Sequence, residues 1–507
     1  MKKEKYSSGL LLLLLMTLIV RGGVLFYDTR TFKEDPDNYR QLAENLEYYG
    51  VFGKGETATA YRPPLYPELL RESFRFTKDA PLTSFPQKAV PKKGSDPLAD
   101  LIAKIPPDLL LTRTTAIALF HWILGLLSVL CVWETAKNLR MSRSAALFAG
   151  FLVAVDPILL QQSRLVMTET LAAFFASAIL LLTVRFYTRR RRLTDLFFLF
   201  FLGIILGIAS LCRPAFLGFA VMIAFFLLIL KKPPKDVAEQ QKIDQKIFEV
   251  PEPQIAETIR EQKPEKKSQH CMSFHPVYLI AFLAGLAIFP GLWTQRNYQE
   301  FKQIIPTTTH AGYTFLLANN ALIYDHNQKV RPWETFWNAE EFHKWWKEKL
   351  TQTASEQGIQ PDSKEMELLQ DRLAKQEGIN IARKRPKDFM RAMGIRIGNL
   401  WQCLPYRTDL EKPETDMVKY GRYSIGIFYA IEILFMILGY HLVLFRKREA
   451  HLPCGTLWIW VFLLILSVQI PHLFFWTNMR MRAPLVVAIA LFAASVFSRK
   501  KKASPPK

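Results

Sequence analysis

Residues 116–132 read AIALFHWILGLLSVLCV and contain no Asp, Glu, Lys or Arg. An apolar run of this length is typical of a helix that crosses a bilayer, because about 20 helical residues span the ~30 Å hydrocarbon core. Comparable runs with almost no charge lie at residues 10–20, 197–211 and 425–445. The sequence therefore predicts an all-α, polytopic membrane protein.

The composition agrees with this interpretation and excludes other classes. Of the 507 residues, 50% are hydrophobic and 13% aromatic, and the mean hydropathy is +0.07 although 22% of the residues are charged. Disordered, collagen-like and small disulfide-rich chains do not have such a composition. The five cysteines form no CxxC pair and no spacing of metal ligands, so they predict neither a metal site nor a disulfide.

The net charge of +21 is concentrated at the ends of the apolar runs. Basic residues cluster in six places, at 2–5, 137–143, 185–192, 231–235, 446–448 and 499–502. Short loops rich in Lys and Arg stay on the cytoplasmic side of a membrane protein. If the chain crosses the membrane ten times, all six clusters lie on that side and both termini are cytoplasmic. We therefore expect a membrane and no nucleic acid as partner.

The expected organisation has about ten transmembrane helices and two extracytoplasmic regions. The spans cover about residues 7–26, 114–135, 144–160, 169–184, 195–211, 215–230, 277–292, 424–445, 456–475 and 483–497. The first should remain uncleaved, because no clean signal-peptidase site follows it. The three parts of the chain are an N-terminal membrane module (1–293), an extracytoplasmic helical region (294–423), and C-terminal membrane helices with a basic tail (424–507). Within the first part, residues 27–113 form an outer loop and residues 231–276 a polar cytoplasmic loop.

The second outer region should be a folded helical cap. Phe336, Trp337, Phe342, Trp345 and Trp346 lie in one stretch, and apolar residues recur at intervals of three and four around Met366, Leu369 and Leu373. Such spacing gives apolar stripes that must be buried. A helix held on the membrane surface by its Trp rings is the alternative.

Acidic residues lie at the outer ends of the expected spans. Asp35 and Asp37 follow the first span, and Glu169 opens the fourth. The two aspartates are candidates for a base or for metal ligands, and capping of the next helix is the alternative. A carboxylate that enters an apolar span is costly without a partner, so Glu169 has either a function or a side chain that reaches the surface.

Basic residues lie on the same face. Arg213, Arg480 and Arg482 occupy short outer loops, where cations are uncommon, and a lipid phosphate or simple headgroup anchoring would explain them. The segment YRPPLYP (61–67) is stiff, because each Pro fixes its own φ and restricts its predecessor. Arg296 adds another cation. Signatures of nucleotide-driven chemistry, zinc proteolysis and serine hydrolysis do not occur in the sequence.

Taken together, these residues resemble the GT-C superfamily of integral-membrane glycosyltransferases, in the bacterial branch related to protein O-mannosyltransferases and aminoarabinose transferases. The resemblance spans most of the chain. It is carried by DPDNYRQLA (35–43), RPPLYP (62–67), TE (168–169), CRP (212–214), RNY (296–298) followed by Gly312 and NN (319–320), and RMRAP (480–484).

The resemblance implies an enzyme of cell-envelope glycosylation in the bacterial inner membrane. It would move a hexose or pentose from a polyprenyl-phosphate carrier to a lipid, glycan or protein acceptor on the extracytoplasmic face. The implied catalytic acids are Asp35, Asp37 and Glu169, the phosphate ligands are Arg213, Arg480 and Arg482, and the positioning residues are Tyr39, Arg62, Tyr66 and Arg296. Asp35 and Glu169 would also hold a divalent cation, Mg²⁺ or Mn²⁺.

Two features depart from the family pattern and one alternative stays open. Asp37 adds an acid to the first motif, so either aspartate could be the base, and the first outer loop carries a long insert rich in Lys and Pro at 78–107. A transporter or flippase of a lipid-linked sugar is the alternative function. A transporter should bury ionisable residues near the middle of the membrane, whereas the centres of the expected spans show almost none.

Overall fold

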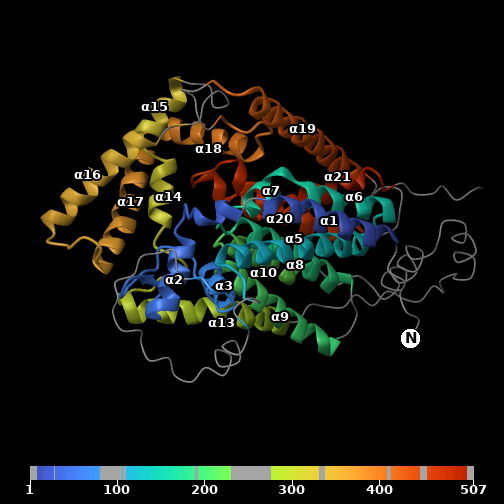
Figure 1. The fold of residues 1–507 in the computed structure, drawn as a ribbon, viewed down its shortest axis with the longest axis horizontal. Helices are drawn as coiled ribbons and strands as arrows, with labels where there is room; N and C mark the ends of the chain where they lie inside the picture. Colours follow the sequence, from blue (N-terminus) through green and yellow to red (C-terminus); the bar gives the residue numbers. More distant parts are fainter. Residues whose placement is uncertain are drawn as a thin grey trace, which may run out of the picture.

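A computed structural model describes residues 8–27, 29–79, 106, 110–188, 192–229, 276–329, 337, 339–407, 413–445 and 454–498. Within these ranges the chain is almost wholly helical. Its one sheet is a short antiparallel hairpin, with β1 (Gly53–Lys54) paired to β2 (Thr57–Ala58) (Figure 1). The prediction of an all-α polytopic membrane protein is confirmed.

Each of the ten expected spans contains a helix. The membrane helices are α1 (Ser8–Tyr27), α5 (Arg113–Asn138), α6 (Arg143–Val155), α7 (Pro157–Ser163), α8 (Glu169–Thr188), α9 (Arg192–Ser210), α10 (Phe216–Ile229), α13 (Pro276–Phe301), α19 (Asp416–Phe445), α20 (Cys454–Gln469) and α21 (Val486–Ser495). In the described ranges, α1, α5, α8, α13 and α19 are long and apolar enough to cross a membrane, and the bent pair α6–α7 is a sixth candidate. The other helices are shorter, so the count of ten stays a prediction.

The break between α6 and α7 follows from two adjacent residues. Pro157 has no backbone N–H and disfavours helical backbone at the residue before it, so a helix that reaches Asp156 must end there. Asp156 then caps the next helix, because one of its carboxylate oxygens accepts the Leu159 N–H at 2.8 Å. The two helices meet at a bend of 43°.

Glycines bring α9 and α13 unusually close together. A Cβ atom at Gly285 of α13 would lie 2.0 Å from the carbonyl oxygen of Phe200, and one at Gly203 of α9 would lie 2.2 Å from that of Phe282. Small residues of this kind let membrane helices pack backbone against backbone. The two helices accordingly run side by side at the lower edge of the bundle in Figure 1.

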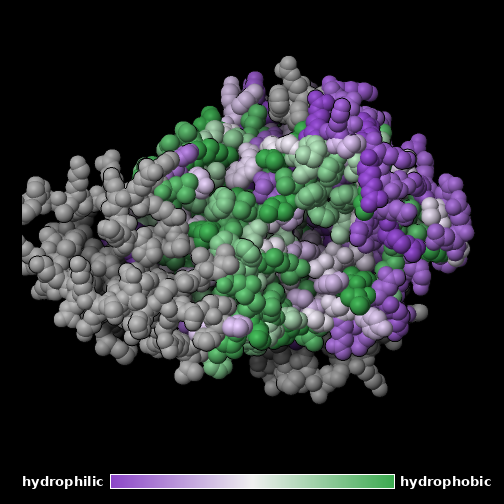
Figure 2. All heavy atoms as spheres, turned by 180° about the vertical axis from the view of Figure 1, so that it is seen from behind, coloured by the Kyte–Doolittle hydropathy of each residue, from purple (hydrophilic) through white to green (hydrophobic). Residues whose placement is uncertain are grey.

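The second outer region forms a helical cap at one end of the bundle. It contains α14 (Ala311–Ala318), α15 (Ala321–Lys329), α16 (Glu340–Glu356), α17 (Lys364–Lys384) and α18 (Pro386–Trp401) (Figure 1). Phe342, Trp346 and Leu369 are buried in its own small core, and Trp337, Trp345, Met366 and Leu373 pack around that core. Phe336 lies outside the described residues. Figure 2 shows hydrophilic residues gathered at this end of the molecule and a broad hydrophobic belt over the membrane helices.

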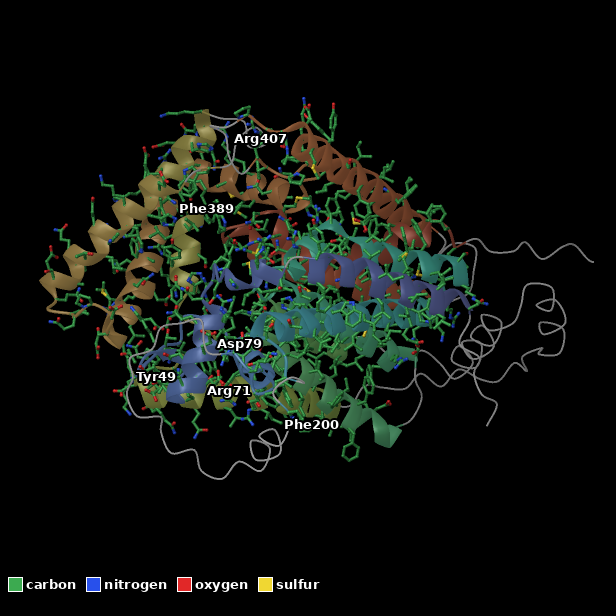
Figure 3. The ribbon with its side chains drawn as sticks, viewed as in Figure 1. Tyr49, Arg71, Asp79, Phe200, Phe389 and Arg407 are labelled. Atoms are coloured by element: carbon green, nitrogen blue, oxygen red, sulfur yellow. The ribbon has the colours of Figure 1, made fainter. Side chains whose placement is uncertain are left out.

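The first outer region contributes η1 (Thr29–Lys33), α2 (Tyr39–Tyr49), the β1–β2 hairpin and α3 (Leu65–Phe74). Most of the Lys- and Pro-rich insert lies outside the described residues. Asp79, which is labelled in Figure 3, joins this region to the bundle, because its carboxylate accepts the Arg113 N–H at 2.7 Å. Two short 3₁₀ helices, η5 (Pro471–Leu473) and η6 (Met479–Leu485), connect α20 to α21.

The membrane helices bury more ionisable groups than the sequence predicted. Arg21 of α1 donates to the Val153 carbonyl at 2.8 Å, and Asp156 accepts from the Tyr429 hydroxyl at 3.1 Å. Glu432 of α19 is buried nearby. The sequence analysis expected almost no ionisable residues at the centres of the spans, and it did not anticipate these buried groups. The broken helix explains the difference in part, since its capping carboxylate needs polar partners inside the bundle.

Candidate active site

The candidate site is formed by loops and helix ends that converge beneath the cap. The loop after η1 supplies Asp35, α3 supplies Tyr66, the first residue of α8 supplies Glu169, the α9–α10 turn supplies Arg213, and η6 supplies Arg480. These segments are far apart in the sequence. They meet because the bundle packs α5 against α8 and α3, and α8 against η6.

Glu169 is fully buried between two arginines. Its Oε1 atom lies 2.7 Å from Arg213 Nη2 and 3.8 Å from Arg480 Nε. The carboxylate also stands at the N-terminus of α8, where the helix dipole favours negative charge. Its Oε2 atom has no hydrogen-bond partner among the described residues. Glu169 thus has two charged partners, both partly exposed, as the cost of a carboxylate in an apolar span required.

The two guanidinium groups beside Glu169 are held mainly by uncharged atoms. Arg213 Nε donates to the Thr168 hydroxyl at 3.1 Å, and its Nη1 lies 3.9 Å from the Met481 sulfur. Arg480 Nη1 lies 3.1 Å from the Met167 sulfur. The two guanidinium groups therefore share the single carboxylate of Glu169. Together, Glu169, Arg213 and Arg480 carry a net charge of +1.

Arg482 does not join this group. It is fully buried, its Nη1 atom donates to the carbonyl oxygens of Leu400 (3.2 Å) and Gln402 (3.0 Å), and its guanidinium lies 4.2 Å from the Tyr429 ring centre. A 3₁₀ helix has about three residues per turn, so side chains two positions apart point in different directions. The Nε and Nη2 atoms of Arg482 have no hydrogen-bond partner among the described residues. The implied role of Arg482 as a phosphate ligand therefore stays a prediction, and its observed contacts tie η6 to α18 and α19.

Asp35 combines a capping contact with a free oxygen atom. Its Oδ2 atom accepts the Gln41 N–H of α2 at 2.8 Å, so the capping interpretation holds for that oxygen. Its Oδ1 atom is buried and has no hydrogen-bond partner in the described part of the chain. Burial raises the pKa of Asp35 above its usual value, against a lowering by the backbone N–H groups of Gln41, Arg40 and Tyr39. The free oxygen is thus more basic than that of an exposed aspartate.

Asp37 is committed to another partner. Its Oδ1 atom lies 2.8 Å from Arg62 Nη2, and both side chains are partly exposed. The Arg62 guanidinium lies 5.6 Å from the Tyr39 ring centre and 5.4 Å from that of Tyr61. The stiff YRPPLYP segment therefore places Arg62 over two aromatic rings at the edge of the site.

Tyr66 is fully buried in the middle of the site. Its ring meets Tyr39 edge to face, with centroids 5.4 Å apart. Its hydroxyl oxygen lies 2.8 Å from Nε2 of His121, a residue that the sequence interpretation treated only as part of an apolar span. Burial raises the pKa of Tyr66 well above its usual value, and the charges of Asp35 and then Glu169 add to the increase. Both catalytic candidates therefore lie near this ring.

Arg296 braces the outer loop. Its Nη1 atom donates to the Thr59 carbonyl at 2.8 Å, its Nη2 atom donates to the Phe52 carbonyl at 2.9 Å, and the guanidinium lies 5.0 Å from the Trp293 ring centre. These contacts fix the β1–β2 hairpin to the end of α13. The geometry thus supports positioning of the loop by Arg296 and not direct positioning of a substrate.

The cap contacts both loops that border the site. Glu367 of α17 accepts hydrogen bonds from the Thr59 hydroxyl (2.6 Å), the Ala60 N–H (2.9 Å) and the Thr309 hydroxyl (2.5 Å). On the other side, Arg396 of α18 donates to the Leu473 carbonyl at 2.7 Å. Phe389 of α18, labelled in Figure 3, packs against Phe474 with ring centroids 6.4 Å apart.

The described residues contain no group of three or more His, Cys, Asp or Glu side chains placed to hold a metal ion. Asp35 Oδ1 and Glu169 Oε2 are nevertheless two buried carboxylate oxygens without hydrogen-bond partners among those residues. Hard divalent cations such as Mg²⁺ bind through one or two carboxylates and complete their coordination with substrate phosphate and water. The two acids thus fit such an ion in chemical type.

Three solved structures match this chain over most of its length at low sequence identity. The oligosaccharyltransferase AglB from Archaeoglobus fulgidus, in complex with an inhibitory peptide and a dolichol-phosphate, is 11% identical with a TM-score of 0.43 over 96% of this chain and 50% of that chain. Another AglB structure, a complex with Zn and sulfate, is 12% identical with a TM-score of 0.41. The match covers 96% of this chain and 48% of that chain. ArnT from Cupriavidus metallidurans, bound to undecaprenyl phosphate, is 12% identical with a TM-score of 0.35. The match covers 96% of this chain and 77% of that chain.

This chain spans about half the length of AglB. No curated protein sequence matches it. Residues 63–238, which include Tyr66, Glu169 and Arg213, match the sequence model described as dolichyl-phosphate-mannose-protein mannosyltransferase. Over that region, the expected resemblance to the family of protein O-mannosyltransferases is confirmed.

Proposed function

We propose that this protein is a membrane glycosyltransferase whose donor is a sugar linked to a polyprenyl phosphate. The observation that carries the proposal is the buried Glu169 between Arg213 and Arg480, at 2.7 and 3.8 Å. Two guanidinium groups and one carboxylate leave one positive charge, which matches the single negative charge of a phosphodiester. The match of residues 63–238 to a mannosyltransferase family supports the same conclusion.

In this mechanism, Arg213 and Arg480 bind the donor phosphate. The phosphate gains negative charge as the bond between it and the anomeric carbon breaks, and preorganised cations stabilise that charge. Guanidinium groups suit the task, because their planar fork can donate two hydrogen bonds to one phosphate. The thioether contacts of Met167 and Met481 hold both groups without neutralising them.

Asp35 acts as the base. The acceptor hydroxyl attacks the anomeric carbon, its oxygen forms the new glycosidic bond, its proton passes to Asp35 Oδ1, and the polyprenyl phosphate leaves with the electron pair of the broken bond. The raised pKa of Asp35 brings this carboxylate closer to the basicity that such a step needs. Asp37 is the weaker candidate, because its carboxylate is paired with Arg62.

We also propose, as the alternative use of the same free oxygens, that Asp35 and Glu169 hold a divalent cation, Mg²⁺ or Mn²⁺, in which case Asp35 Oδ1 would be a ligand of the ion and not the base. When bound, such an ion would supply additional positive charge to the donor phosphate. The transferred group is a hexose or a pentose, and the acceptor is a lipid, glycan or protein on the extracytoplasmic face. The enzyme resides in the bacterial inner membrane with both termini in the cytoplasm.

A transporter of a lipid-linked sugar is the second candidate, because the bundle buries Arg21, Asp156 and Glu432. Ionisable groups inside a membrane bundle are typical of transport pathways. However, both carboxylate oxygens of Asp156 are already bound, to Leu159 and Tyr429, which is typical of a structural role. Proteoliposomes that carry the donor lipid would distinguish the two functions, since a flippase moves the intact lipid and a transferase cleaves it.

The proposal is tested with the purified protein, synthetic polyprenyl-phosphate sugars and cell-envelope acceptors, with products followed by mass spectrometry. Asp35→Asn keeps the cap to Gln41 and removes the base, so transfer should fall by about 100-fold or more while protein accumulation is unchanged. Asp37→Asn is the matched control and should retain most of the activity. Full transfer by the Asp35→Asn variant would overturn the assignment, and a loss confined to Asp37→Asn would move the base to that residue.

A further inference from the structure

A pocket lies between the cap and the connection from α20 to α21, outside the group formed by Glu169, Arg213 and Arg480. Its walls come from α14, α15, α18 and residues 476–478, and α15 and α18 lie side by side at the top of Figure 1. Residues 476–478 lead directly into η6, which begins at Met479 and carries Arg480. Two residues of chain span at most about 7 Å, so the pocket borders the candidate active site.

Aromatic and aliphatic side chains form part of the pocket wall. Trp337 and Trp476 both line it, and their ring centroids lie 5.7 Å apart. Ile323, Ala392 and Ile395 add apolar surface. A sugar ring presents C–H groups on its faces and hydroxyl groups at its edge. A ligand with this pattern can cover the aromatic surface and still make hydrogen bonds at its edge.

Arg396 brings a charge without a counter-ion to the same pocket. The residue is 5% exposed. Its Nε atom donates to the Leu473 carbonyl at 2.7 Å, and its Nη1 atom donates to the Ala318 carbonyl at 2.8 Å and to the Asn319 amide oxygen at 3.3 Å. Among the described residues its Nη2 atom has no hydrogen-bond partner, and no carboxylate pairs with the guanidinium. A buried cation without a counter-ion is costly, so the pocket favours an anionic ligand.

Asn478 supplies an acceptor to the pocket. Its Oδ1 atom is buried without a hydrogen-bond partner in the described part of the chain, and its side chain does not cap η6. The pocket therefore offers one unsatisfied donor on α18 and one unsatisfied acceptor at the start of η6. A carboxylate could accept from Arg396 while a hydroxyl of the same sugar donates to Asn478.

We propose that this pocket binds a sugar that carries a carboxylate, and that this sugar is a unit of the acceptor. The inference rests on the proposed transferase function and narrows its acceptor to a glycan with an acidic unit. The single charge of Arg396 matches the single charge of a carboxylate. The pocket is narrow, and its volume of about 570 Å³ includes solvent at its mouth. It therefore admits one sugar unit, and the hydroxyl that reacts lies on the part of the acceptor beyond the pocket.

A binding experiment tests the pocket without any transferase activity. The purified protein is labelled with 5-fluorotryptophan in lipid nanodiscs, and the resonances of Trp476 and Trp345 are those that disappear in Trp476→Phe and Trp345→Phe. Sodium D-glucuronate should move the Trp476 resonance and leave that of Trp345, which packs around the core of the cap, in place. D-glucose and sodium acetate should bind about tenfold more weakly or less, because each lacks one half of the recognised pattern. Equal binding of glucose or acetate, or no movement with glucuronate, would overturn the proposal.

Asn478→Ala tests the pocket with little risk to the fold, because the amide makes no hydrogen bond within the described ranges. It should weaken glucuronate binding by about fivefold or more at an unchanged melting temperature. Gln357→Ala, which removes an exposed amide elsewhere in the cap, is the matched control and should bind glucuronate as the wild type does. Arg396→Gln should remove the preference for glucuronate over glucose. If loss of its backbone contacts prevents folding, Asn478→Ala decides, and unchanged glucuronate binding by that variant would refute the assignment.

Transfer assays separate this inference from the transferase function. With a synthetic oligosaccharide that contains glucuronate as acceptor, Asn478→Ala should raise the acceptor KM by about fivefold and change the donor KM by less than about twofold. An equal kcat/KM for a peptide or for the neutral oligosaccharide would contradict the acidic acceptor and leave the transferase function standing. Glucuronate binding at Trp476 in a protein that transfers no sugar would support the pocket and count against the transferase function alone.

Discussion

Arg480 and Arg482 are separated by one residue and have different surroundings. Arg480 lies beside Glu169 and the Met167 sulfur, whereas Arg482 is enclosed by carbonyl oxygens of the α18 end and the face of Tyr429. At the residue scale, the function of a cation in this protein depends on whether its neighbours leave its charge available.

Substitution of the two arginines should give different defects. Arg480→Ala should raise the donor KM by about tenfold or more at normal protein yield. Arg480→Lys should recover part of the loss, because Lys restores the positive charge but not the planar guanidinium that can donate two hydrogen bonds to one phosphate. Arg482→Ala should instead lower stability by about 3 kcal/mol, because it leaves buried carbonyl groups unpaired. Donor titrations and melting temperatures separate the two outcomes. A stable Arg482→Ala variant with a defect confined to donor binding would return Arg482 to the phosphate site.

A pH dependence is expected from His310, whose ring meets that of Tyr61 edge to face with centroids 4.3 Å apart. Burial, together with the smaller effect of the Arg62 charge, lowers the pKa of His310 to about 3. The unfolded chain therefore binds this proton more tightly than the native protein does. The stabilisation is complete above about pH 6.5 and is lost as the pH falls towards 3, at up to about 1.4 kcal/mol per pH unit.

Thermal unfolding between pH 7 and pH 5 checks this expectation. The wild-type melting temperature should fall more steeply than that of His310→Asn, which cannot titrate. Equal slopes for the wild type and His310→Asn would contradict the expectation.

The sequence was sufficient for part of the site. Glu169, Arg213 and Arg480 stand out because charge at the outer end of an apolar span needs a partner, and the structure brings these three together. The same rule does not reveal that Arg296 and Arg482 contact backbone carbonyl groups, so their roles at the site stay predictions. His121 was missed because a lone histidine in an apolar run looks like a core residue until its contact with Tyr66 is known.

At the scale of elements, the cap is attached to the first outer loop mainly through one side chain. Glu367 of α17 accepts three hydrogen bonds from residues 59, 60 and 309. The close approach of Gly312 to α17 fixes α14 on the other side, since a Cβ atom there would lie 2.1 Å from the Asp371 carbonyl oxygen. The cap is thus held to the site by contacts at α17.

Removal of the Glu367 carboxylate should loosen the cap. Glu367→Ala leaves the Ala60 N–H and two hydroxyl groups without their acceptor, which should cost about 1–3 kcal/mol of local stability. Limited proteolysis in proteoliposomes should then cut faster at Lys344 and Lys347 of α16, and donor lipid should protect less well. Glu365→Ala, an exposed acid on the same helix, is the control. Unchanged cutting in Glu367→Ala would show that other contacts hold the cap.

The elements themselves were largely predictable, and their packing was not. Apolar runs and basic flanks located a helix in every expected span, because the bilayer imposes both signals on the sequence. The Asp156–Pro157 break carries a local signal, a capping residue followed by proline, that marks a helix end. The close pairing of α9 and α13 depends on Gly203 and Gly285, which are far apart in the sequence. Their role is visible only in the fold, where each leaves room for the backbone of the other helix.

At the scale of the whole molecule, the charge distribution predicts its orientation. From the basic clusters we expect the short loops on the cytoplasmic side and the two long regions outside. Reporter fusions at Lys88 and Gly358 should therefore be detected on the extracytoplasmic side, and a fusion at Lys246 in the cytoplasm. A cytoplasmic signal from Gly358 would invert the cap and contradict the ten-span topology.

The charge of the Glu169 group also has a consequence for turnover. The group carries one net positive charge, because Arg213 and Arg480 share a single carboxylate. The proposed donor, a sugar linked to a polyprenyl phosphate, is a phosphodiester with one negative charge, whereas its spent carrier would be a monoester with up to two. The group formed by Glu169, Arg213 and Arg480 should therefore bind the spent carrier more tightly than the donor. Release of the carrier, and not bond cleavage, should then limit the rate of repeated cycles.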